Sequence, residues 1–378
     1  MEKSKFSIAL LSTGLGHVQR GVEAWTDDLG KELVTHSINV TVYKGGGKRD
    51  FPHERVISCI QRASRLSNWI ISHRPGFMWR FGFGSGYSLE QMTFCFSIIP
   101  SILIKQFNII HTKDPDVALF CQRLQQIRLI RSKVILGHGT EEPFEFLKKF
   151  DYIQHLAPFH QKEALKNEVQ CKKEFTIGIA IDTLRFTPGQ KTDIRKELGI
   201  PDNAFVILSV AAIKKSHKRI DYLIDEVCEI ANDNIYLLVA GAKEADTDEL
   251  INSALNRLGK RAIFITNLQR ERIWELYAIA DVFVLCSLKE MLGMVILEAI
   301  SSGVPAIVHK YPVEEWVVGA GGESIDMSKS GELAQTINKY LNQEYRLNKG
   351  RKAREQAVNN FSKESITQQI LKMYTDVL

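Results

Sequence analysis

The sequence predicts an α/β protein of two tandem domains, each a doubly wound parallel sheet with helices on both faces. The chain of 378 residues is too long for one ordinary α/β domain and suits two. Short β-rich runs alternate with helical patterns almost from end to end, which is typical of parallel sheets. Hydrophobic residues make up 44% of the chain and charged residues 25%, a composition that can fill a sizeable core.

The first domain is predicted over residues 1–183. Its strand candidates are 6–11, 38–43, 108–112, 133–138 and 152–156, and its helix candidates are 22–34 and 116–127. The first apolar run is short and leads directly into a glycine-rich loop, so a strand explains it better than a signal peptide does. Residues 56–100 have no clear pattern but contain Trp69, Trp79 and several arginines. Packing, a binding-site insertion or contact with lipid would each explain them.

The second domain is predicted over residues 184–363 and repeats the pattern of the first. Its strand candidates are 205–211, 235–240, 262–266, 281–286 and 305–309, and its helix candidates are 221–231, 246–258, 270–279 and 295–302. In open parallel sheets ligands bind beyond the carboxyl ends of the strands, where the βα loops converge. We therefore expect the chemistry in residues that follow strands, in a cleft between the two domains.

Charge and cysteine content narrow the function classes. The net charge is +5, with +7 over residues 1–188 (25 Lys/Arg against 18 Asp/Glu) and −2 over the remainder (24 against 26). A basic first half would attract an anionic acceptor or membrane surface, although a mildly biased solvated surface has the same composition. No dense basic run with interleaved aromatic residues indicates nucleic acid. No stretch approaches the ~18 apolar residues of a spanning helix, and six scattered cysteines favour free thiols in a cytoplasmic protein.

Two loops of the first domain contain candidate site residues. Gly14, Gly16 and His17 follow the first strand and precede a helix, where backbone N–H groups can meet a phosphate. A tight structural turn would explain these glycines equally well. His138 lies between Gly137 and Gly139 at the end of another strand, so we expect it to be exposed and functional.

The first βα loop of the second domain is rich in cations. Lys214, Lys215, Lys218 and Arg219 follow its first strand and would neutralise a diphosphate at the carboxyl edge of the sheet. A solvated loop is also rich in lysine, so this cluster alone does not decide between the two readings.

The most informative segment runs from Leu285 to Pro305. Glu290 lies in a loop after a strand, and Gly293 permits a tight turn into a helix that begins near Met294 and contains Glu298. The N-terminus of this helix can face a phosphate. Glu290 would then accept hydrogen bonds from sugar hydroxyls, while Glu298 lies deeper, at the level of a ribose.

These residues resemble glycosyltransferase family 4, the retaining enzymes with the GT-B fold, also described as glycosyl transferases group 1. The resemblance is firm over most of residues 175–340 and loose in the N-terminal half. Besides the Glu290–Glu298 block it rests on 180–186, Lys218 before 220–224, 276–285, Gly14, Gly16, Gly303, Pro305, Gly321 and Gly322. It implies that a C-terminal helix, residues 364–378, rejoins the N-terminal domain.

The resemblance also implies roles. Lys218 would bind the donor diphosphate, Glu290 the donor sugar and Glu298 the ribose, with His138 near the reacting carbon, so that His138, Glu290 and Lys218 form the catalytic set. The N-terminal domain would bind the acceptor, with Gly14 and His17 on the acceptor side, and the C-terminal domain the donor. The implied donor-binding residues are Gly16, Lys214, Lys218, Arg219, Asn267, Leu292, Gly293, Met294 and Glu298.

One position departs from the family pattern. Ile213 stands where the family commonly has an arginine, and Lys214, Lys215 or Arg219 would have to replace that cation. A lysine cannot reproduce a bidentate guanidinium. The resemblance implies no metal, and the predicted site offers no carboxylate cluster that would bind one.

The sequence indicates the class of reaction more closely than it indicates the substrates. UDP is the expected nucleotide on frequency, and the acceptor is a glycan, an envelope polysaccharide, a glycolipid or a natural-product scaffold. Two other readings stay open: a GT-B enzyme of another kind, such as a nucleotide-sugar epimerase or a phosphorylase, and a nucleotide-sugar-binding protein that has lost catalysis. The sequence predicts a cytoplasmic protein with peripheral contact with an anionic membrane, and it indicates no oligomeric state.

Overall fold

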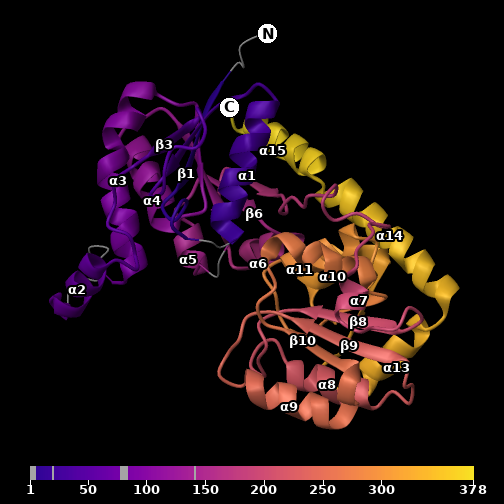
Figure 1. The fold of residues 1–378 in the computed structure, drawn as a ribbon. Coiled ribbons are helices and arrows are strands. Elements are labelled where there is room, and N and C mark those ends of the chain that lie inside the picture. The colour runs from indigo at the N-terminus through magenta and orange to yellow at the C-terminus, as the bar shows by residue number, and fades with distance from the viewer. Residues whose placement is uncertain (1–5, 19–20, 77–83, 140–141) are drawn as a thin grey trace. The chain divides into compact units, whose positions relative to one another are not determined.

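The computed structural model describes residues 6–18, 21–76, 84–139 and 142–378, which form two compact units (Figure 1). Unit 1 comprises Met1–Gly178 and Thr367–Leu378, and unit 2 comprises Ile179–Ile366. The sequence prediction had placed the boundaries at 183 and 364. The assignment of acceptor to the first unit and donor to the second stays a prediction.

Unit 1 is built on a seven-stranded sheet with the order β3-β2-β1-β4-β5-β6-β7, in which every pair of neighbours is parallel. Its strands are β1 (Ser7–Ser12), β2 (Asn39–Lys44), β3 (Glu54–Val56), β4 (Ile109–Thr112), β5 (Lys133–His138), β6 (Tyr152–His155) and β7 (Lys173–Thr176). Strands are added toward one edge of the sheet from β1 to β3 and toward the other edge from β4 to β7. The carboxyl ends of β1 and β4 therefore form the topological switch point where such sheets bind ligands.

The helices of unit 1 cover the two faces of this sheet. They are α1 (Gly21–Thr35), α2 (Arg65–His73), α3 (Gly86–Lys105), α4 (Pro115–Gln126), α5 (Phe144–Leu147), α6 (Pro158–Lys166) and most of α15 (Lys363–Val377). One core cluster joins the inner faces of α3 and α4 to β1 and β4, with Phe94, Ile98, Ile110 and Val117 fully buried. The C-terminal helix contacts the sheet directly, because His111 Nδ1 lies 2.9 Å from the Tyr374 hydroxyl.

Residues 56–100 are more regular than the sequence suggested. Helix α2 and the first part of α3 occupy most of this region, while Trp79 lies outside the described residues. Helix α3 is also long and apolar enough, by length and composition, to cross a membrane. The expectation that no stretch reaches that limit was therefore wrong. One face of α3 belongs to the core of unit 1, as in a core helix.

Unit 2 is a six-stranded parallel sheet with the order β10-β9-β8-β11-β12-β13. Its strands are β8 (Phe205–Val210), β9 (Ile235–Ala240), β10 (Ala262–Ile265), β11 (Val282–Leu285), β12 (Ala306–His309) and β13 (Gly322–Ile325). The four inner strands are buried almost from end to end, as expected for strands covered by helices on both faces, whereas the edge strands β10 and β13 are partly exposed.

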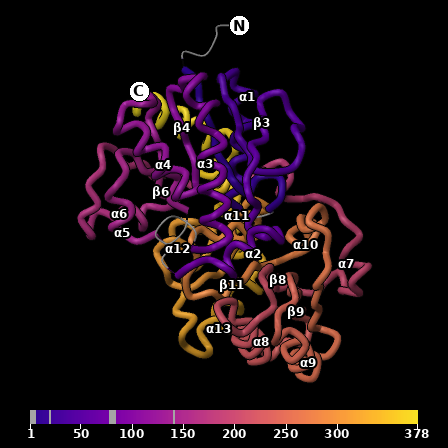
Figure 2. The backbone as a smooth tube through the Cα atoms, turned by 90° about the vertical axis from the view of Figure 1, so that its left-hand side faces the viewer, coloured from indigo at the N-terminus to yellow at the C-terminus, as the bar shows by residue number. Residues whose placement is uncertain are grey.

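The helices of unit 2 complete its two outer layers (Figure 2). They are α7 (Ile194–Glu197), α8 (Ile220–Cys228), α9 (Thr247–Leu258), α10 (Ile273–Ile279), α11 (Met294–Ser301), α12 (Pro312–Val318), α13 (Glu332–Tyr340) and α14 (Gln343–Phe361), with short 3-10 turns η2 (Gly259–Arg261), η3 (Arg270–Arg272) and η4 (Gly319–Gly321). The switch point of this sheet lies between β8 and β11, the strands that precede the two most informative sequence motifs.

Candidate functional site

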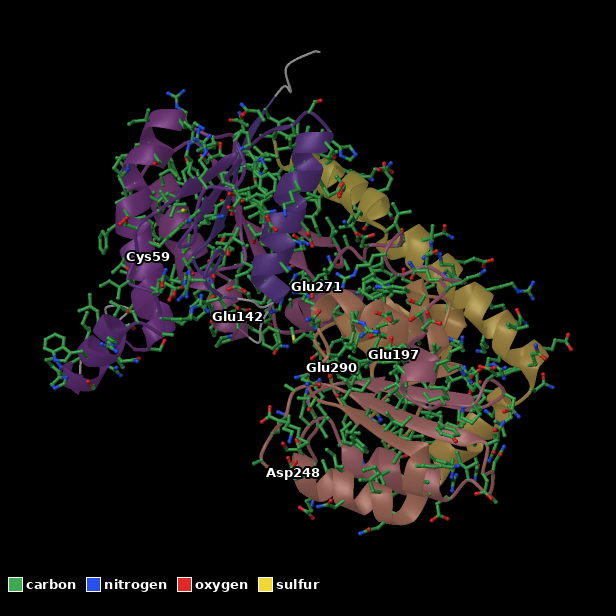
Figure 3. All side chains as sticks on the ribbon, in the orientation of Figure 1. Cys59, Glu142, Glu197, Asp248, Glu271 and Glu290 are labelled. Carbon is green, nitrogen blue, oxygen red and sulfur yellow. The ribbon has the colours of Figure 1, made fainter. Side chains whose placement is uncertain are left out.

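The loop from β11 to α11 places the two predicted glutamates at the carboxyl edge of the unit 2 sheet. Glu290 lies in this loop (Figure 3), and Glu298 lies on α11. Gly293 adopts a left-handed conformation (φ +78°) directly before the helix, and a Cβ there would lie 2.7 Å from Ile296 Cδ1. Among the described residues no side chain caps α11, so its first backbone N–H groups are available to an anion.

Glu290 is the centre of a small charged cluster. The Lys218 ammonium forms a close ion pair with Glu290, and His217 Nε2 lies 3.5 Å from the same carboxylate oxygen. The structure therefore brings together Lys218 and Glu290, which lie 72 residues apart in sequence. Both side chains keep some access to solvent, which suits groups that bind a ligand.

The other cations of the lysine-rich loop have different partners. Lys214 lies 3.9 Å from Glu244, and the Lys215 ammonium lies 2.6 Å from Glu249. Arg219 donates to the backbone oxygen of Met327 and stacks over Tyr222. Ile213, which stands where the family commonly has an arginine, is fully buried in the unit 2 core. Because Lys214 has the longest of these contacts, it is the best placed to turn toward a diphosphate.

Glu298 lies on α11, and a buried tyrosine holds its carboxylate. The Tyr277 hydroxyl donates to Glu298 Oε2 at 2.7 Å. Burial raises the pKa of Glu298, although the nearby guanidinium groups of Arg185 and Arg270 act against that rise. A half-buried carboxylate with one fixed oxygen can direct its other oxygen to a hydroxyl pair such as that of a ribose.

The remaining predicted donor residues surround this loop. Leu292 is buried and Met294 is the first residue of α11. Asn267 is exposed in the segment that follows β10. These placements follow from the fold of unit 2, and the binding roles of the residues stay predictions.

Glu314 is a site residue that sequence reasoning missed. It lies on α12, only 1% exposed, and neither of its carboxylate oxygens has a hydrogen-bond partner among the described residues. Burial, together with the charge of Glu290 close by, raises the pKa of Glu314 to about 8. Glu315, the next residue in sequence, is less buried and accepts a hydrogen bond from the Ser324 hydroxyl. Glutamates are frequent in the chain, and no sequence signal marks this one as buried beside Glu290.

In unit 1 the glycine-rich loop after β1 packs against the loop after β2. Gly16 has φ +97°, and a Cβ there would lie 2.2 Å from the backbone oxygen of Gly46. A Cβ on Gly14 would lie 2.2 Å from Glu23 Oε1. Both glycines are thus required by close packing, the structural explanation that the sequence left open. His17 lies beside them, with Nε2 3.0 Å from Glu90 Oε2.

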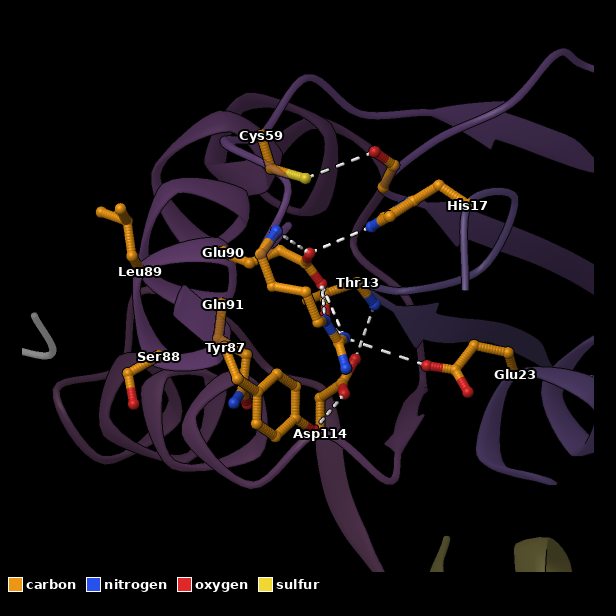
Figure 4. A network of polar contacts seen from close by, with 12 residues as sticks. Thr13, His17, Glu23, Cys59, Tyr87, Ser88, Leu89, Glu90, Gln91 and Asp114 are labelled. Carbon is orange, nitrogen blue, oxygen red and sulfur yellow. Dashed lines mark hydrogen bonds and ion pairs between the residues drawn. The ribbon is translucent and has the colours of Figure 1, made fainter. Parts of the chain in front are cut away.

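A network of buried charges lies next to this loop (Figure 4). Glu90 on α3 accepts from the Arg62 backbone N–H at 2.6 Å and from its guanidinium at 2.6 and 3.0 Å. Although burial alone would raise it, these bonds lower the pKa of Glu90. Asp114 accepts from the Thr13 N–H at 2.6 Å and from the Tyr87 hydroxyl at 2.8 Å. The network joins the ends of β1 and β4 to α3, and sequence reasoning did not find it.

The expectation that His138 is exposed was wrong. It is the last residue of β5 and is buried, with Nδ1 3.1 Å from His155 Nδ1 and Nε2 3.4 Å from Glu142. The His160 ring lies 5.9 Å from the His138 ring. His155 lies on β6, the parallel neighbour of β5, and His160 lies on α6. The glycines that flank His138 in sequence give no information about this packing. A role near the reacting carbon stays a prediction.

Lys113, at the end of β4, is a further buried cation. Its side chain has no hydrogen bond or ion pair to any residue that the structure describes, and its ammonium lies 4.4 Å from the centre of the Trp25 ring. Burial lowers the pKa of Lys113 to about 7. Over the described ranges, no group of three or more His, Cys, Asp or Glu side chains is arranged to hold a metal ion, and the six cysteines are all free.

Comparisons with known proteins agree with this geometry. Residues 190–361, nearly all of unit 2, match the family model described as glycosyl transferases group 1. N-acetyl-alpha-D-glucosaminyl L-malate synthase of Bacillus anthracis is 28% identical over 274 residues, which cover 68% of this chain and 69% of that protein.

Solved structures match the whole chain. Sucrose-phosphate synthase from Thermosynechococcus elongatus superposes with a TM-score of 0.75 at 20% identity, covering 99% of each chain. HepE from Anabaena, in complex with UDP and glucose, gives a TM-score of 0.73 at 15% identity over 98% of this chain and 100% of its own. The two parallel α/β units thus have the GT-B fold, and residues 190–361 of the second unit match the glycosyl transferases group 1 family.

Proposed function

We propose that this glycosyltransferase moves a sugar from a nucleotide-diphosphate sugar, expected to be a UDP-sugar, to a hydroxyl of its acceptor, with retention of configuration and without a divalent metal. The observation that carries this proposal is the Lys218–Glu290 pair beside the uncapped N-terminus of α11, with Glu298 held on the same helix. Groups suited to bind an anion, a sugar and a ribose therefore lie together at the carboxyl edge of one sheet.

Each of these groups has a distinct task. The Lys218 ammonium would leave Glu290 to meet the diphosphate, with the N–H groups that begin α11 and Lys214 adding positive potential. Glu290, relieved of its partner, would accept hydrogen bonds from the donor sugar. Glu298, fixed by Tyr277, would bind the ribose. The UDP and glucose in the related HepE structure support this class of donor.

The same groups would stabilise the transition state. Negative charge grows on the leaving diphosphate as the sugar–oxygen bond breaks, and Lys218 and the helix N-terminus face that charge. Retention would follow from attack on the face that the diphosphate leaves, with a donor phosphate oxygen accepting the proton of the acceptor hydroxyl. Glu290 has no nucleophilic role in this scheme, because its carboxylate is committed to sugar hydroxyls.

Unit 1 would bind the acceptor near Gly14, His17 and the end of β4. A glycan of a polysaccharide pathway, a glycolipid or a small natural product would fit this role, and similar proteins are named for acceptors as different as L-malate and inositol 3-phosphate. We also propose a cytoplasmic location with peripheral contact between the basic unit 1 and an anionic membrane.

The test is a thermal-shift series with UDP, GDP, ADP and CDP, with and without magnesium. A ligand at 100 times its Kd adds about 2.7 kcal/mol of stability. We expect one diphosphate, UDP, to shift the transition, magnesium to change nothing, and Glu298→Ala to abolish the shift. Leu255→Ala, on the exposed side of α9, is the matched control. A shift from no diphosphate, or one that requires magnesium, would contradict the proposal.

Transfer itself needs a second readout. Incubation with the donor alone, followed by product analysis, distinguishes the candidate enzyme classes: conversion to an epimeric nucleotide sugar without acceptor would mean epimerase chemistry. Tight donor binding with no transfer to any acceptor and no slow hydrolysis would indicate a binding protein, in which the loss of the family arginine at Ile213 has removed catalysis.

A further inference from the structure

Helix α2 has almost no role in the core of unit 1. Of its nine residues only Ser67 is buried. Trp69 is 60% exposed and Leu66 53% exposed, and Arg65 lies beside them on the same short helix. A tryptophan is costly to leave in water because of its large apolar area. The helix therefore presents a surface that favours an apolar partner.

Helix α3 continues this surface. Its inner face is core, but its outer face leaves Phe96 61% exposed and Ile104 82% exposed, with Pro100 exposed between them. These three positions are four residues apart and so lie along one side of the helix. An amphipathic helix of a water-exposed protein would have polar residues there.

The two helices form one face of unit 1. They pack against each other, and a Cβ on Gly86, the first residue of α3, would lie 2.5 Å from the backbone oxygen of Arg62, just before α2. Figure 1 draws both at the left-hand edge of unit 1, and Figure 2, turned to bring that side forward, draws both toward the viewer. We call Leu66, Trp69, Phe96 and Ile104 the α2–α3 face.

Basic residues predominate in the part of the sequence that contains these two helices. Between Glu54 and Asp114 the sequence has seven lysine or arginine residues and a single acidic residue, Glu90. Glu90 is fully buried and is neutralised by Arg62. Arg65 lies on α2 and Arg74 directly follows it, and neither α2 nor the outer side of α3 has an acidic residue. The surface is therefore apolar and basic together.

We propose that the α2–α3 face docks onto an anionic lipid bilayer. Trp69, Leu66, Phe96 and Ile104 would enter the headgroup and upper acyl region, while the flanking basic side chains meet the anionic headgroups, each adding about 1 kcal/mol. The inner face of α3 remains in the core, so the protein lies on the membrane and does not cross it. This proposal names the surface for the membrane contact proposed above.

The docked face is continuous with the acceptor side of unit 1. Arg62 lies two residues before the Ser64 cap of α2, and its partner Glu90 lies on α3. The helices that would meet the bilayer are thus the ones that hold the charge network beside His17. An acceptor carried by a membrane lipid would reach this network without leaving the bilayer surface.

Vesicle co-sedimentation of the full chain tests the proposal. We expect binding to vesicles of phosphatidylcholine mixed with phosphatidylglycerol, weak binding to phosphatidylcholine alone, and loss of binding at high salt. The double variant Leu66→Ala/Trp69→Ala should bind at least about tenfold more weakly, because it removes two large apolar side chains. Leu255→Ala/Leu347→Ala removes two exposed leucines of unit 2 and should bind as the wild type does.

Tryptophan fluorescence gives an independent readout. The chain has five tryptophans, and a blue shift on adding anionic vesicles that disappears in Trp69→Phe would place Trp69 in the membrane. Equal binding to neutral and anionic vesicles, or wild-type binding by the Leu66→Ala/Trp69→Ala variant, would overturn the proposal. So would a dimer in size-exclusion chromatography that this variant dissociates, since a second copy would then cover the face.

Failure here is separable from failure of the proposed function. The UDP-induced thermal shift depends on unit 2 and should be unchanged in the Leu66→Ala/Trp69→Ala variant, which also confirms that the variant is folded. A retained shift without vesicle binding rejects the docking surface alone. Vesicle binding without any diphosphate shift rejects the donor site alone.

Discussion

The two units use charged residues differently at the carboxyl edges of their sheets. In unit 1, Glu90 is fully shielded from solvent and pairs with Arg62 within the fold. In unit 2, Lys218 and Glu290 pair with each other but remain accessible to solvent, next to a helix N-terminus that no side chain caps. Similar chemical groups therefore have a structural role in one unit and a proposed ligand-binding role in the other.

This difference has a simple energetic consequence. A buried pair costs desolvation on folding, so loss of one partner leaves an uncompensated charge in the interior. A solvent-accessible pair contributes little to stability, because water replaces either partner. We expect substitutions in the unit 1 network to reduce stability and substitutions in the unit 2 cluster to reduce donor binding and turnover.

The largest effect should come from Glu90→Ala. Without Glu90, the largely buried Arg62 guanidinium keeps one ion-pair partner among the described residues, Glu23 at 3.8 Å, and a weak contact with the Thr13 hydroxyl. The free energy of unfolding should fall by on the order of 3–5 kcal/mol, measured by urea denaturation. Glu290→Ala is the control and should change it by less than about 1 kcal/mol. Equal effects of the two variants would remove the distinction between the units.

Lys218→Ala should have the next largest effect, and on activity. Loss of a preorganised cation facing the leaving diphosphate costs about 3 kcal/mol of transition-state stabilisation, or on the order of a hundredfold in kcat/KM. The matched control is Lys215→Ala in the same loop, whose ammonium is engaged by Glu249. Steady-state kinetics should find that control within about twofold of wild type. If Lys215→Ala were as impaired as Lys218→Ala, the loss of activity would reflect the general positive potential of the loop and not a specific contact of Lys218.

The sequence was most informative where its signals are local. Apolar runs identified five strands of each sheet, because a strand covered on both faces needs no polar alternation, but the prediction did not include the edge strands β3, β7 and β13. The β11–α11 segment combines a strand, a glycine turn and a helix start within a short stretch, so Glu290, Gly293 and Glu298 could be placed from it directly.

The sequence failed where structure depends on distant partners. Arg62 and Glu90 are 28 residues apart in sequence, and His138 is buried by neighbours on β6 and α6. Helix α3 gave no helical period, because apolar residues occupy both its buried and its exposed sides. Helix α2 is only nine residues long and buries only Ser67, so its apolar residues do not mark a core. The burial of Glu314 also depends on the folded structure, so nothing in the local sequence distinguishes it from the other glutamates.

Lys113→Met sharpens the comparison within unit 1, since this cation lacks the carboxylate that Arg62 has. The pKa of Lys113 is lowered to about 7 by burial, from an ordinary value of 10.5. Between these pH values the unfolded state binds the extra proton, so wild-type stability should rise as the pH increases from 7 toward 10.5. Below pH 7 the variant should be more stable than wild type, by about 2–3 kcal/mol.

The measurement is urea denaturation of both proteins from pH 6 to pH 10. The difference between them isolates Lys113, because the other titrating groups are common to both. Lys148→Met, which removes an exposed lysine 2.6 Å from Glu145, should give no pH-dependent difference. A constant difference across the pH range would mean that Lys113 stays charged in the folded protein and is stabilised by a group other than the Trp25 ring.

The smallest effect is expected for Tyr277→Phe, which tests whether support from a buried neighbour matters at the ligand-facing site. The Tyr277 hydroxyl donates to Glu298 Oε2, and its loss should cost about 1 kcal/mol of donor affinity, or roughly fivefold in the Kd for UDP measured by calorimetry. If Glu298 binds the ribose, 2′-deoxy-UDP should lose part of this difference, since it lacks one of the hydroxyls that the carboxylate contacts. An equal loss for both nucleotides would mean that Tyr277 positions the start of α11 through packing, and that the carboxylate of Glu298 acts elsewhere than on the ribose.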